Sequence, residues 1–365
     1  MMKKVLVFGM TENPGGIESV IMNYYRNINR EVIQFDFLCN CRTIAYEKEI
    51  ESLGGKIFSV TARKKNPLEF RKQMNDFMKL HAKEYDAIWV NVCSLVNIDY
   101  LIFAKKYKIP KIIIHCHNSD NDGNQIKKLV HLYNKNRIEK YATDFWSCSD
   151  AASPWFFGQK IIHSDKYKVI PNAIDVEQYE RNDEVRIAMR KKYQLEDKIV
   201  IGHVGRFHFQ KNHSFLIDIF EQLARRNDKY RLILIGQGAL ENDIKKLVAQ
   251  KSLEKKVIFC GVQSDTSEFY QMMDCFVLPS LFEGLGIVAL EAQACSLPCV
   301  LSDQVPSIVK VNDNVSFLSL KADLNKWADT IEYYTSHSDL CLENHMQESI
   351  FSIKKQTDFF ERLLL

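Results

Sequence analysis

The sequence lacks the long apolar runs and the regularly spaced cysteines that mark two large classes of protein. No window approaches about 18 consecutive apolar residues, the length that a membrane-spanning helix needs. No pair among the ten cysteines has Cys-x-x-Cys spacing, and the histidines complete no zinc pattern. Most cysteines instead fall inside apolar, strand-like runs such as "VIFCG", which is typical of reduced core residues in a cytoplasmic protein.

The amino terminus also lacks the features of a secretory signal. Residues 1–16, "MMKKVLVFGMTENPGG", combine lysines with a short apolar run that meets Thr-Glu-Asn-Pro instead of a small-residue cleavage site. This segment is therefore interpreted as a first β-strand. With 365 residues, 46% of them apolar and 26% charged, the chain is expected to form two globular domains.

Short β-branched runs alternate with amphipathic helical segments along most of the chain. Seven strands are predicted in the first half, at residues 4–10, 33–39, 56–60, 87–92, 111–116, 144–149 and 167–172. Six more are predicted at residues 199–205, 231–236, 256–261, 275–280, 298–303 and 315–320. Apolar strands that alternate with helices form parallel, doubly wound sheets, so the predicted fold class is α/β.

A polar, charged bridge between the two sets of strands divides the chain. We predict a Rossmann-like amino-terminal domain over residues 1–176 and a second Rossmann-like domain over residues 177–349. A closing helix at residues 350–365 is expected to pack back on the first domain. Because ligands bind outside the carboxyl ends of parallel strands, functional residues are expected in strand-to-helix loops.

Charge is distributed unevenly between the two halves. Residues 1–175 contain 26 Lys and Arg against 19 Asp and Glu, a net charge of +7, whereas residues 176–365 have a net charge of −4. Two basic helical segments, at residues 62–83 and 124–141, could lie on an anionic membrane surface. Neither segment combines a strong Trp, Phe or Leu face with a clean basic face, and ordinary solvated helix surfaces are the alternative.

Two cations stand in one loop of the second domain. The strand "IGHVG" ends at Gly205, Arg206 follows it, and Lys211 precedes the helix predicted at residue 213. Cations at a helix amino terminus suit a diphosphate, because the helix end adds partial positive charge. For this loop alone, solvated surface residues are the alternative. In the next loop, Gly236 and Gly238 would let the backbone approach a ligand, although a single Gly-x-Gly is weak evidence.

The stretch "SLFEGLGIVALE", residues 280–291, holds two carboxylates eight positions apart. Glu283 is predicted in a strand-to-helix loop, and Glu291 about two turns into the following helix. Gly284 and Gly286 would expose backbone N–H groups at the helix start, which suits a phosphate or a sugar oxygen. Glu283 could accept hydrogen bonds from hydroxyls, and Glu291 could accept two from the vicinal hydroxyls of a ribose. These patterns together describe a site for a nucleotide sugar.

The first domain offers two further candidate loops. In "TENPGGIES", Gly15 and Gly16 stand between the first strand and the first helix. This is not the Gly-x-Gly-x-x-Gly pattern of dinucleotide-binding folds, which counts against an NAD enzyme. His115 and His117, in "HCHNS", end a strand on one face, where a histidine is often structural.

Taken together, these motifs resemble the family 4 retaining glycosyltransferases of the GT-B fold. The resemblance runs along most of the chain and rests on "NPGGIE", "HCHNS", "VIPNAID", "VGRFHFQKN", "LILIGQG" and "LPSLFEGLGIVALEAQACSLPCVLSD". The last motif is the most specific, because Glu283 and Glu291 match the family's Glu-x7-Glu. "FDFLCN" and "HCHNS" look like the branch that builds bacterial capsular or exopolysaccharide repeat units. One departure is Ser296, which stands where the family has glycine.

The resemblance implies two domains that face each other across a cleft, and it implies roles for individual residues. Arg206 and Lys211 would hold the donor diphosphate, Glu291 the ribose and Glu283 the donor sugar, and His117 would sit beside the transferred sugar. The candidate catalytic residues are therefore His117, Glu283, Arg206 and Lys211. The candidate donor-binding residues are Gly15, Gly16, Gly205, Arg206, Lys211, Gly236, Val262, Glu283, Gly284, Leu285, Gly286, Ile287 and Glu291.

Within that set, the family implies that the backbone near Val262 meets the base and that Gly16 lets the first domain approach the phosphates. The implied reaction moves a sugar from a nucleotide diphosphate sugar, most often a UDP-sugar, to a saccharide or polyprenyl-diphosphate-linked acceptor with retention. The leaving diphosphate would itself accept the acceptor proton, and no cofactor or metal is expected. Nor is a nucleic-acid partner expected, and the implied location is the cytoplasm, at the inner face of the cell membrane. Replacing Arg206 or Lys211 by alanine is expected to abolish transfer with little change in stability.

Three alternatives stay open at this point. The same fold serves UDP-N-acetylglucosamine 2-epimerases, and a nucleotide-sugar sensor would bind without turnover. A metal-dependent transferase could use Asp120 and Asp122, since Asp-x-Asp binds a divalent metal and diphosphate in the other major glycosyltransferase fold. Those two aspartates stand in a polar Asn/Gly-rich segment, so we interpret them as ordinary turn-forming residues of a loop and not as metal ligands.

Overall fold

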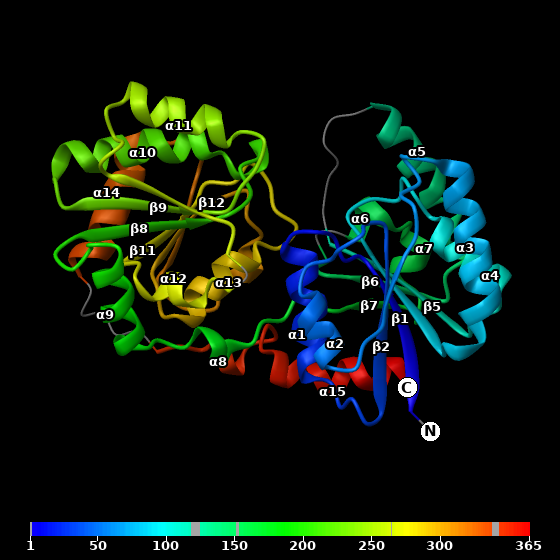
Figure 1. The fold of residues 1–365 in the computed structure, drawn as a ribbon. Helices are drawn as coiled ribbons and strands as arrows, with labels where there is room; N and C mark the ends of the chain where they lie inside the picture. The colour runs from blue at the N-terminus through cyan, green and yellow to red at the C-terminus, as the bar shows by residue number, and fades with distance from the viewer. Residues whose placement is uncertain (1, 118–124, 151–152, 264, 338–342) are drawn as a thin grey trace. The chain divides into compact units, whose positions relative to one another are not determined.

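The computed structural model describes residues 2–117, 125–150, 153–263, 265–337 and 343–365 (Figure 1). It divides into two compact units, the first formed by Met1–Ala173 with Ile353–Leu365 and the second by Ile174–Ser352. The division falls three residues before the predicted position at residue 176, and the carboxyl-terminal helix belongs to the first unit. No helix within the described ranges is long and apolar enough to cross a membrane.

A seven-stranded parallel sheet forms the centre of the first unit, in the order β3-β2-β1-β4-β5-β6-β7. The strands are Lys3–Phe8 (β1), Ile33–Cys39 (β2), Ile57–Ser59 (β3), Ala87–Val92 (β4), Lys111–Cys116 (β5), Asp144–Ser147 (β6) and Tyr167–Val169 (β7). The strand order reverses between β1 and β4, which is where open α/β sheets present a ligand-binding crevice.

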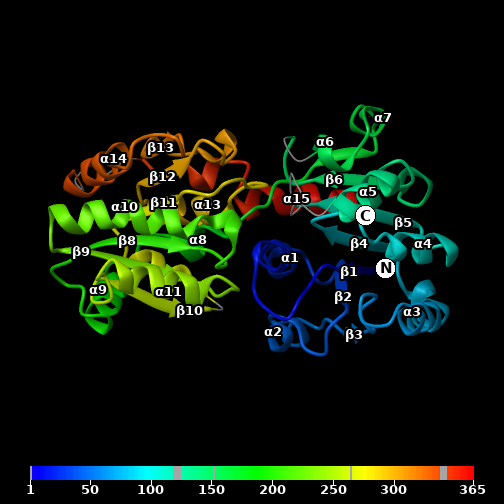
Figure 2. The ribbon, with the colours of Figure 1, turned by 90° about the horizontal axis from the view of Figure 1, so that it is seen from above.

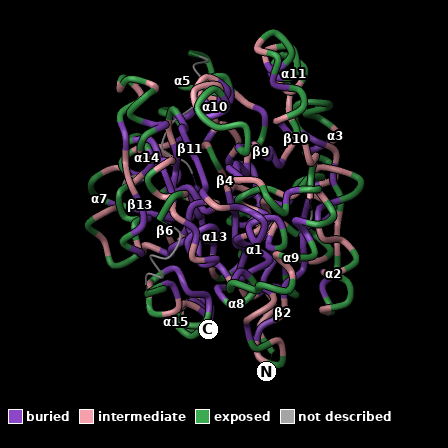
Figure 3. The backbone as a smooth tube through the Cα atoms, turned by 90° about the vertical axis from the view of Figure 1, so that its left-hand side faces the viewer, coloured by how far each residue is buried: buried purple, intermediate pink, exposed green. Residues whose placement is uncertain are grey.

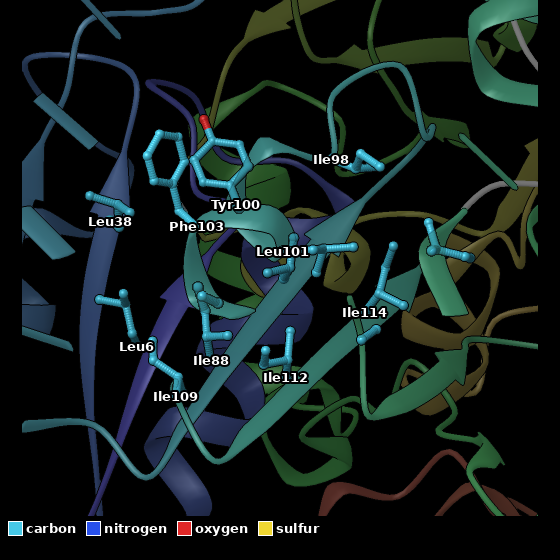
Figure 4. Close-up of a cluster of buried hydrophobic side chains, with 14 of the residues drawn as sticks. Leu6, Leu38, Ile88, Ile98, Tyr100, Leu101, Phe103, Ile109, Ile112 and Ile114 are labelled. Carbon is cyan, nitrogen blue, oxygen red and sulfur yellow. The ribbon is translucent and has the colours of Figure 1, made fainter. Parts of the chain in front are cut away.

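Helices cover both faces of this sheet (Figure 2). They are Gly16–Asn27 (α1), Glu47–Ser52 (α2), Pro67–His81 (α3), Asp99–Lys106 (α4), Gln125–Lys135 (α5), Ser153–Phe156 (α6), Gln159–Ile162 (α7) and Ile353–Leu364 (α15). On one face, Leu6, Ile88 and Ile112 belong to an apolar cluster with residues of α3 and α4 (Figure 4). On the other face, Tyr24 of α1 stacks on Phe360 of α15 with ring centroids 4.1 Å apart. This stacking holds the carboxyl-terminal helix on the first unit.

The second unit is built around a six-stranded parallel sheet in the order β10-β9-β8-β11-β12-β13. The strands are Ile199–Val204 (β8), Tyr230–Ile235 (β9), Val257–Gly261 (β10), Cys275–Leu278 (β11), Cys299–Ser302 (β12) and Val315–Leu318 (β13). The helices are Val176–Tyr179 (α8), Asp183–Lys192 (α9), His213–Arg226 (α10), Glu241–Gln250 (α11), Ser267–Gln271 (α12), Ile287–Ala294 (α13) and Leu324–Ser336 (α14). Helix α13 is buried along almost its whole length (Figure 3).

The prediction of an α/β fold with two parallel sheets is confirmed. Each predicted strand has a counterpart in the structure, and most begin within one residue of the predicted start. Several end early. Strand β11, for example, stops at Leu278 because Pro279 has no backbone N–H with which to continue the ladder.

Candidate active site

Most of the predicted site residues stand at the carboxyl edge of the sheet in the second unit. Arg206 and Lys211 lie in the loop between β8 and α10, and Gly236 directly follows β9. Glu283 lies in the loop between β11 and α13. Parallel strands present their carboxyl ends at one edge, so these three loops meet there.

Lys211 and Glu283 form a largely buried ion pair. The Lys211 Nζ atom lies 2.7 Å from Glu283 Oε1, and the two side chains are 15% and 7% exposed. Ser280 Oγ donates to the same carboxylate oxygen at 2.6 Å, and Gln210 Nε2 donates to Oε2 at 3.3 Å. The Glu283 carboxylate is therefore held in one orientation by contacts from two loops.

This pair changes the expectation that Lys211 could be removed with little change in stability. Without the ammonium, a carboxylate that is 7% exposed would lose its ion pair with Lys211. An uncompensated buried charge is strongly destabilising. The expectation of unchanged stability now applies to Arg206 alone.

Arg206 differs from Lys211 in its surroundings. Arg206 is exposed, and its guanidinium has no hydrogen bond or ion pair within the described part of the chain. Its five N–H groups are therefore available to a ligand, and their planar arrangement suits the oxygens of a phosphate.

Gly286 starts the helix that follows the Glu283 loop. Its φ of 89° and ψ of 52° lie in the left-handed region, and it is the N-cap residue of α13. No side chain caps the helix, so the first backbone N–H groups of α13 keep their donor capacity. Leu285 and Ile287, on either side of Gly286, are buried, and Gly284 precedes them in the same loop. The helix end can therefore bind a phosphate or a sugar oxygen through the main chain.

Two of the predicted glycines are explained by close contacts at the loop between β8 and α10. A Cβ atom on Gly236, whose φ is 136°, would lie 2.2 Å from the carbonyl oxygen of Gly205. A Cβ atom on Gly205 would lie 3.1 Å from Lys211 Cδ. These glycines allow the loop that holds Arg206 and Lys211 to fold tightly and to pack against the loop that follows β9.

Glu291 lies closer to the start of α13 than the sequence analysis predicted. The helix begins at Ile287, so Glu291 is about one turn inside it, not two. Its side chain is buried, and the Tyr270 hydroxyl donates to Oε2 at 2.7 Å. Burial raises the pKa of Glu291 to about 7, against hydrogen bonds from Tyr270 and Tyr179 and the charge of Lys211, which all lower it.

Val262 is placed at the edge of the same sheet. It follows β10, the terminal strand of the sheet, and its side chain is 39% exposed. Gly261, just before it, has a φ of 66°, which turns the chain at the end of the strand. An exposed turn at this edge is compatible with main-chain contact to a base.

Gly15 and Gly16 begin helix α1 in the first unit, and Glu18 closes the loop before them. Glu18 Oε1 accepts hydrogen bonds from the Thr11 N–H at 3.1 Å and from Thr11 Oγ1 at 2.5 Å. A Cβ atom on Gly15 would lie 2.8 Å from Glu18 Oε2. A carboxylate thus occupies the amino end of α1, a favourable place for negative charge that the sequence analysis did not assign.

His117 follows β5, also in the first unit, and its ring is tightly held. Its Nε2 atom lies 2.8 Å from Asn91 Oδ1 and its Nδ1 atom 3.1 Å from Asn172 Oδ1. Asn91 Nδ2 donates to the Phe8 carbonyl at 3.3 Å, which fixes the Asn91 amide with its Oδ1 toward the ring. Burial lowers the pKa of His117 to about 4, so the ring is neutral near pH 7. Both ring nitrogens face protein side chains.

Candidate metal ligands were sought among the described residues of both sets of loops. Within the described ranges, no group of three or more His, Cys, Asp or Glu residues is arranged to hold a metal ion. Asp120 and Asp122, the Asp-x-Asp candidate, lie outside the described residues.

Comparison with known proteins gives the family. The model of the family described as "Glycosyl transferases group 1" matches residues 185–347, most of the second unit. EpsF of Bacillus subtilis, a glycosyltransferase by name, is 33% identical over 335 residues, which cover 90% of this chain and 87% of that protein. The chain therefore belongs to the group 1 glycosyltransferases, the bacterial family 4 enzymes of the GT-B fold.

One further relative and one solved structure extend this comparison. The UDP-Gal:alpha-D-GlcNAc-diphosphoundecaprenol alpha-1,3-galactosyltransferase of Escherichia coli is 24% identical over 302 residues, which cover 79% of this chain and 76% of that enzyme. The crystal structure of Anabaena HepE in complex with UDP and glucose superposes with a TM-score of 0.82, covering 100% of this chain and 99% of HepE. At 17% sequence identity, this likeness to HepE establishes the fold.

Some residues of the site were missed from the sequence. Ser280, Gln210 and Tyr270 hold the two carboxylates of the Glu-x7-Glu motif. Gln210 and Tyr270 are separated from their partners by 73 and 21 residues, so no local pattern could reveal them. Ser280, three residues before Glu283, was the only one with a local signal.

Proposed function

We propose that this glycosyltransferase transfers a sugar from a nucleotide diphosphate sugar, with uridine as the favoured base, and retains the anomeric configuration. The observation that carries the proposal is a set of groups suited to phosphate at the carboxyl edge of the second sheet. They are the Lys211–Glu283 pair, the exposed Arg206 and the uncapped start of α13. The complex of HepE with UDP and glucose supports a UDP-sugar donor.

The donor diphosphate would be held by Lys211 and Arg206. A lysine ammonium has three N–H donors, and one of them is directed at Glu283, so two can reach phosphate oxygens. Stabilising charge on the departing diphosphate would then be the main catalytic effect, and it requires no metal ion. In this reaction the diphosphate accepts the acceptor proton as it leaves, and no side chain needs to act as the base.

Glu283 and Glu291 would bind the sugar and the ribose of the donor. Glu283, oriented by Ser280 and Lys211, would accept hydrogen bonds from sugar hydroxyls together with the N–H groups at residues 284–287. Glu291 would accept hydrogen bonds from the ribose hydroxyls, and the main chain at Val262 would meet the base. In the first unit, His117 would support the sugar through its fixed position, since its ring nitrogens already have partners.

We propose that the acceptor is a saccharide on a polyprenyl diphosphate, in the synthesis of a cell-surface polysaccharide. The support is the Escherichia coli relative, whose name specifies a diphosphoundecaprenol-linked substrate. The net charge of +7 in residues 1–175 is compatible with an anionic, lipid-linked acceptor. The corresponding location is the cytoplasm, at the inner face of the cell membrane.

The first test is nucleotide diphosphate release from UDP-, GDP- and ADP-sugars, with and without EDTA, alongside thermal shifts for each donor. We expect one donor class to be hydrolysed or transferred equally well in EDTA, and to stabilise the protein. Loss of turnover in EDTA would contradict metal independence and return attention to Asp120 and Asp122. Inversion of the anomeric centre, read by NMR of the product, would contradict retention.

Arg206→Ala tests the phosphate site. Because Arg206 is exposed and has no partner among the described residues, we expect transfer to fall by about 100-fold or more with no change in the unfolding midpoint. Arg225→Ala, an exposed arginine at the far end of α10, is the matched control and should transfer like the wild type. Full activity in Arg206→Ala would refute the assignment.

A further inference from the structure

The two loops that hold Lys211 and Glu283 also bring two aromatic rings to the edge of the site. Phe209, two residues before Lys211, is 44% exposed, and Phe282, directly before Glu283, is half-buried. Their ring centroids lie 5.8 Å apart, at an interplanar angle of 53°. We call these two rings the aromatic rim. Large apolar side chains that meet at the surface beside a ligand site are characteristic of a binding surface, so the rim is a candidate for ligand contact.

Hydrogen bonds between the two loops hold the aromatic rim in place. The Leu281 N–H donates to the Gln210 carbonyl at 2.8 Å, and Gln210 Nε2 donates to the Phe282 carbonyl at 3.0 Å. The Phe209 ring also packs against the His208 ring, with centroids 4.5 Å apart. Because these contacts already order the rim, a ligand that binds there loses little free energy to the ordering of the protein.

The chemistry around the aromatic rim indicates what it would bind. Lys211 and Glu283 are the groups that we assign to the donor diphosphate and the donor sugar. A pyranose sugar has hydroxyls around its edge and an apolar face of C–H groups, whose slight positive charge suits the negative face of an aromatic ring. Because Glu283 and the N–H groups at residues 284–287 are assigned to the donor sugar, the rim is left for the second sugar of the reaction.

We propose that the aromatic rim binds a sugar ring of the acceptor. The C–H face of that sugar would pack on Phe209 and Phe282. One of its hydroxyls would then stand beside the donor sugar at Glu283, in the place that transfer requires. The proposal deepens the proposed function, since it rests on a saccharide acceptor, and it assigns part of the acceptor site to the second unit.

A second pair of exposed rings in the same unit provides the matched control. Tyr333 of α14 is 52% exposed and packs against Tyr334, with ring centroids 5.6 Å apart. The nearby Thr335 Oγ1 atom lies 3.1 Å from the hydroxyl of Tyr230, the first residue of β9. This contact puts the Tyr333 pair at the amino edge of the sheet, whereas the site loops lie at the carboxyl edge. The two pairs therefore differ chiefly in position.

The test is saturation-transfer NMR of the full chain with the methyl glycosides of glucose, galactose and N-acetylglucosamine, with and without UDP. We expect at least one of these sugars to receive saturation, mainly at the C–H protons of one ring face. Phe209→Ala and Phe282→Ala should each weaken its affinity by about fivefold or more, because each removes one ring from the contact. Phe209→Leu, which stays apolar but loses the aromatic face, should weaken it less. Tyr333→Ala should bind the sugar like the wild type.

Equal sugar affinities for the wild type and the two alanine variants would overturn the proposal, and so would the absence of saturation in all three sugars with the wild type. Weaker stabilisation of Phe209→Ala by UDP-glucose, with unchanged glycoside binding, would assign the aromatic rim to the donor and would also overturn it. Thermal unfolding checks that each variant is folded. Because the NMR signal requires no transfer, glycoside binding can fail while donor turnover stands, and donor turnover can fail while glycoside binding stands.

Discussion

The loop at residues 280–286 and the helix α13 that directly follows it each hold one carboxylate, in very different surroundings. Glu283, in the loop, is paired with an ammonium and accepts two further hydrogen bonds. Glu291, in the helix, is equally buried, but its side-chain donors are the phenols of Tyr270 and Tyr179, and burial raises its pKa to about 7. One sequence motif therefore contains a carboxylate with a fixed positive partner and another whose charge depends on pH.

The difference follows from where the neighbouring loops lie. Glu283 faces the loop between β8 and α10, which supplies Gln210 and Lys211. Glu291 faces helices α12 and α8, which supply the phenols of Tyr270 and Tyr179. A carboxylate with a cation beside it suits contact with a neutral sugar next to a diphosphate, whereas a carboxylate between phenols suits ribose hydroxyls, which are themselves neutral donors.

The largest expected effect is that of Lys211→Ala. It removes the cation that we propose for the donor diphosphate, and it breaks the ion pair between Lys211 and the buried Glu283. We expect transfer to fall by at least about 100-fold and the free energy of unfolding to fall by about 2 to 4 kcal/mol. Enzyme assays and urea denaturation measure the two effects.

Lys251→Ala is the matched control, since Lys251 pairs with Asp218 and Glu221 in the same unit but away from the site loops. It should keep transfer activity. The double variant Lys211→Ala with Glu283→Gln should recover part of the lost stability, because the uncompensated charge is gone. If Lys211→Ala is as stable as the wild type, the ion pair does not form in solution.

The pH dependence of Glu291 should be the next largest effect. Its pKa is about 7 in the folded protein against an ordinary value of 4.5, so the folded state retains a proton that the unfolded state releases between those values. The wild type should therefore lose stability relative to Glu291→Gln as pH rises from 4.5 to 7, by about 1 to 3 kcal/mol, with no further change above 7. Urea denaturation at pH 4.5, 6 and 8 measures this difference.

Glu221→Gln serves as a control, because its effect on the free energy of unfolding should change with pH in the opposite direction. A hydrogen bond from Lys251 lowers the pKa of Glu221, so its stabilising contribution is present above the unfolded pKa and is lost as pH falls. Its stability deficit relative to the wild type should grow from acid to neutral pH. A pH-independent difference between the wild type and Glu291→Gln would show that Glu291 is not desolvated.

Much of the fold could be predicted from the sequence, because it depends on local patterns. Apolar β-branched runs located the strands of both sheets, and a strand ending in Pro279-Ser280 followed by a run of strong helix formers located the loop that holds Glu283. The Lys211–Glu283 pair and the Tyr270–Glu291 hydrogen bond could not be predicted, since each joins residues that only the folded chain brings together. The orientation of helix α5 could not be predicted either: its exposed residues Ile126, Leu129 and Tyr133 have ordinary helical spacing, and the hydrogen bonds of the buried His131 and Asn134 fix the opposite face inward.

Tyr270→Phe tests the phenol beside Glu291 with a smaller expected effect. The change removes hydrogen bonds to Glu291 at 2.7 Å and to the Val288 carbonyl at 3.2 Å while the ring stays in place. We expect a loss of about 1 kcal/mol in stability and a several-fold weaker donor affinity below pH 7, because the Glu291 pKa rises further. Thermal shifts with the donor at pH 6 and pH 8 measure the affinity.

The matched control is Tyr230→Phe. Tyr230 is also buried in the second unit, and its hydroxyl lies 3.1 Å from Thr335 Oγ1. It should lose a similar amount of stability and bind the donor normally at both pH values. Equal donor affinities for Tyr270→Phe and Tyr230→Phe would remove Glu291 from the donor site.

The two ends of α13 differ in the residue that adopts the left-handed conformation. A substitution at the carboxyl end should have the smallest of the expected effects, and it should stabilise the protein. Gly286 begins the helix in the left-handed region, and Ser296, just beyond its carboxyl end, is also left-handed with a φ of 58°. The family has glycine at this second position, and the backbone gives the reason, since a residue with a Cβ is strained there. Ser296→Gly should therefore raise the free energy of unfolding by about 0.5 to 1 kcal/mol. Ser336→Gly, near the end of α14 in ordinary helical conformation, should lower it, and if both substitutions destabilise, the left-handed turn after α13 is not present in solution.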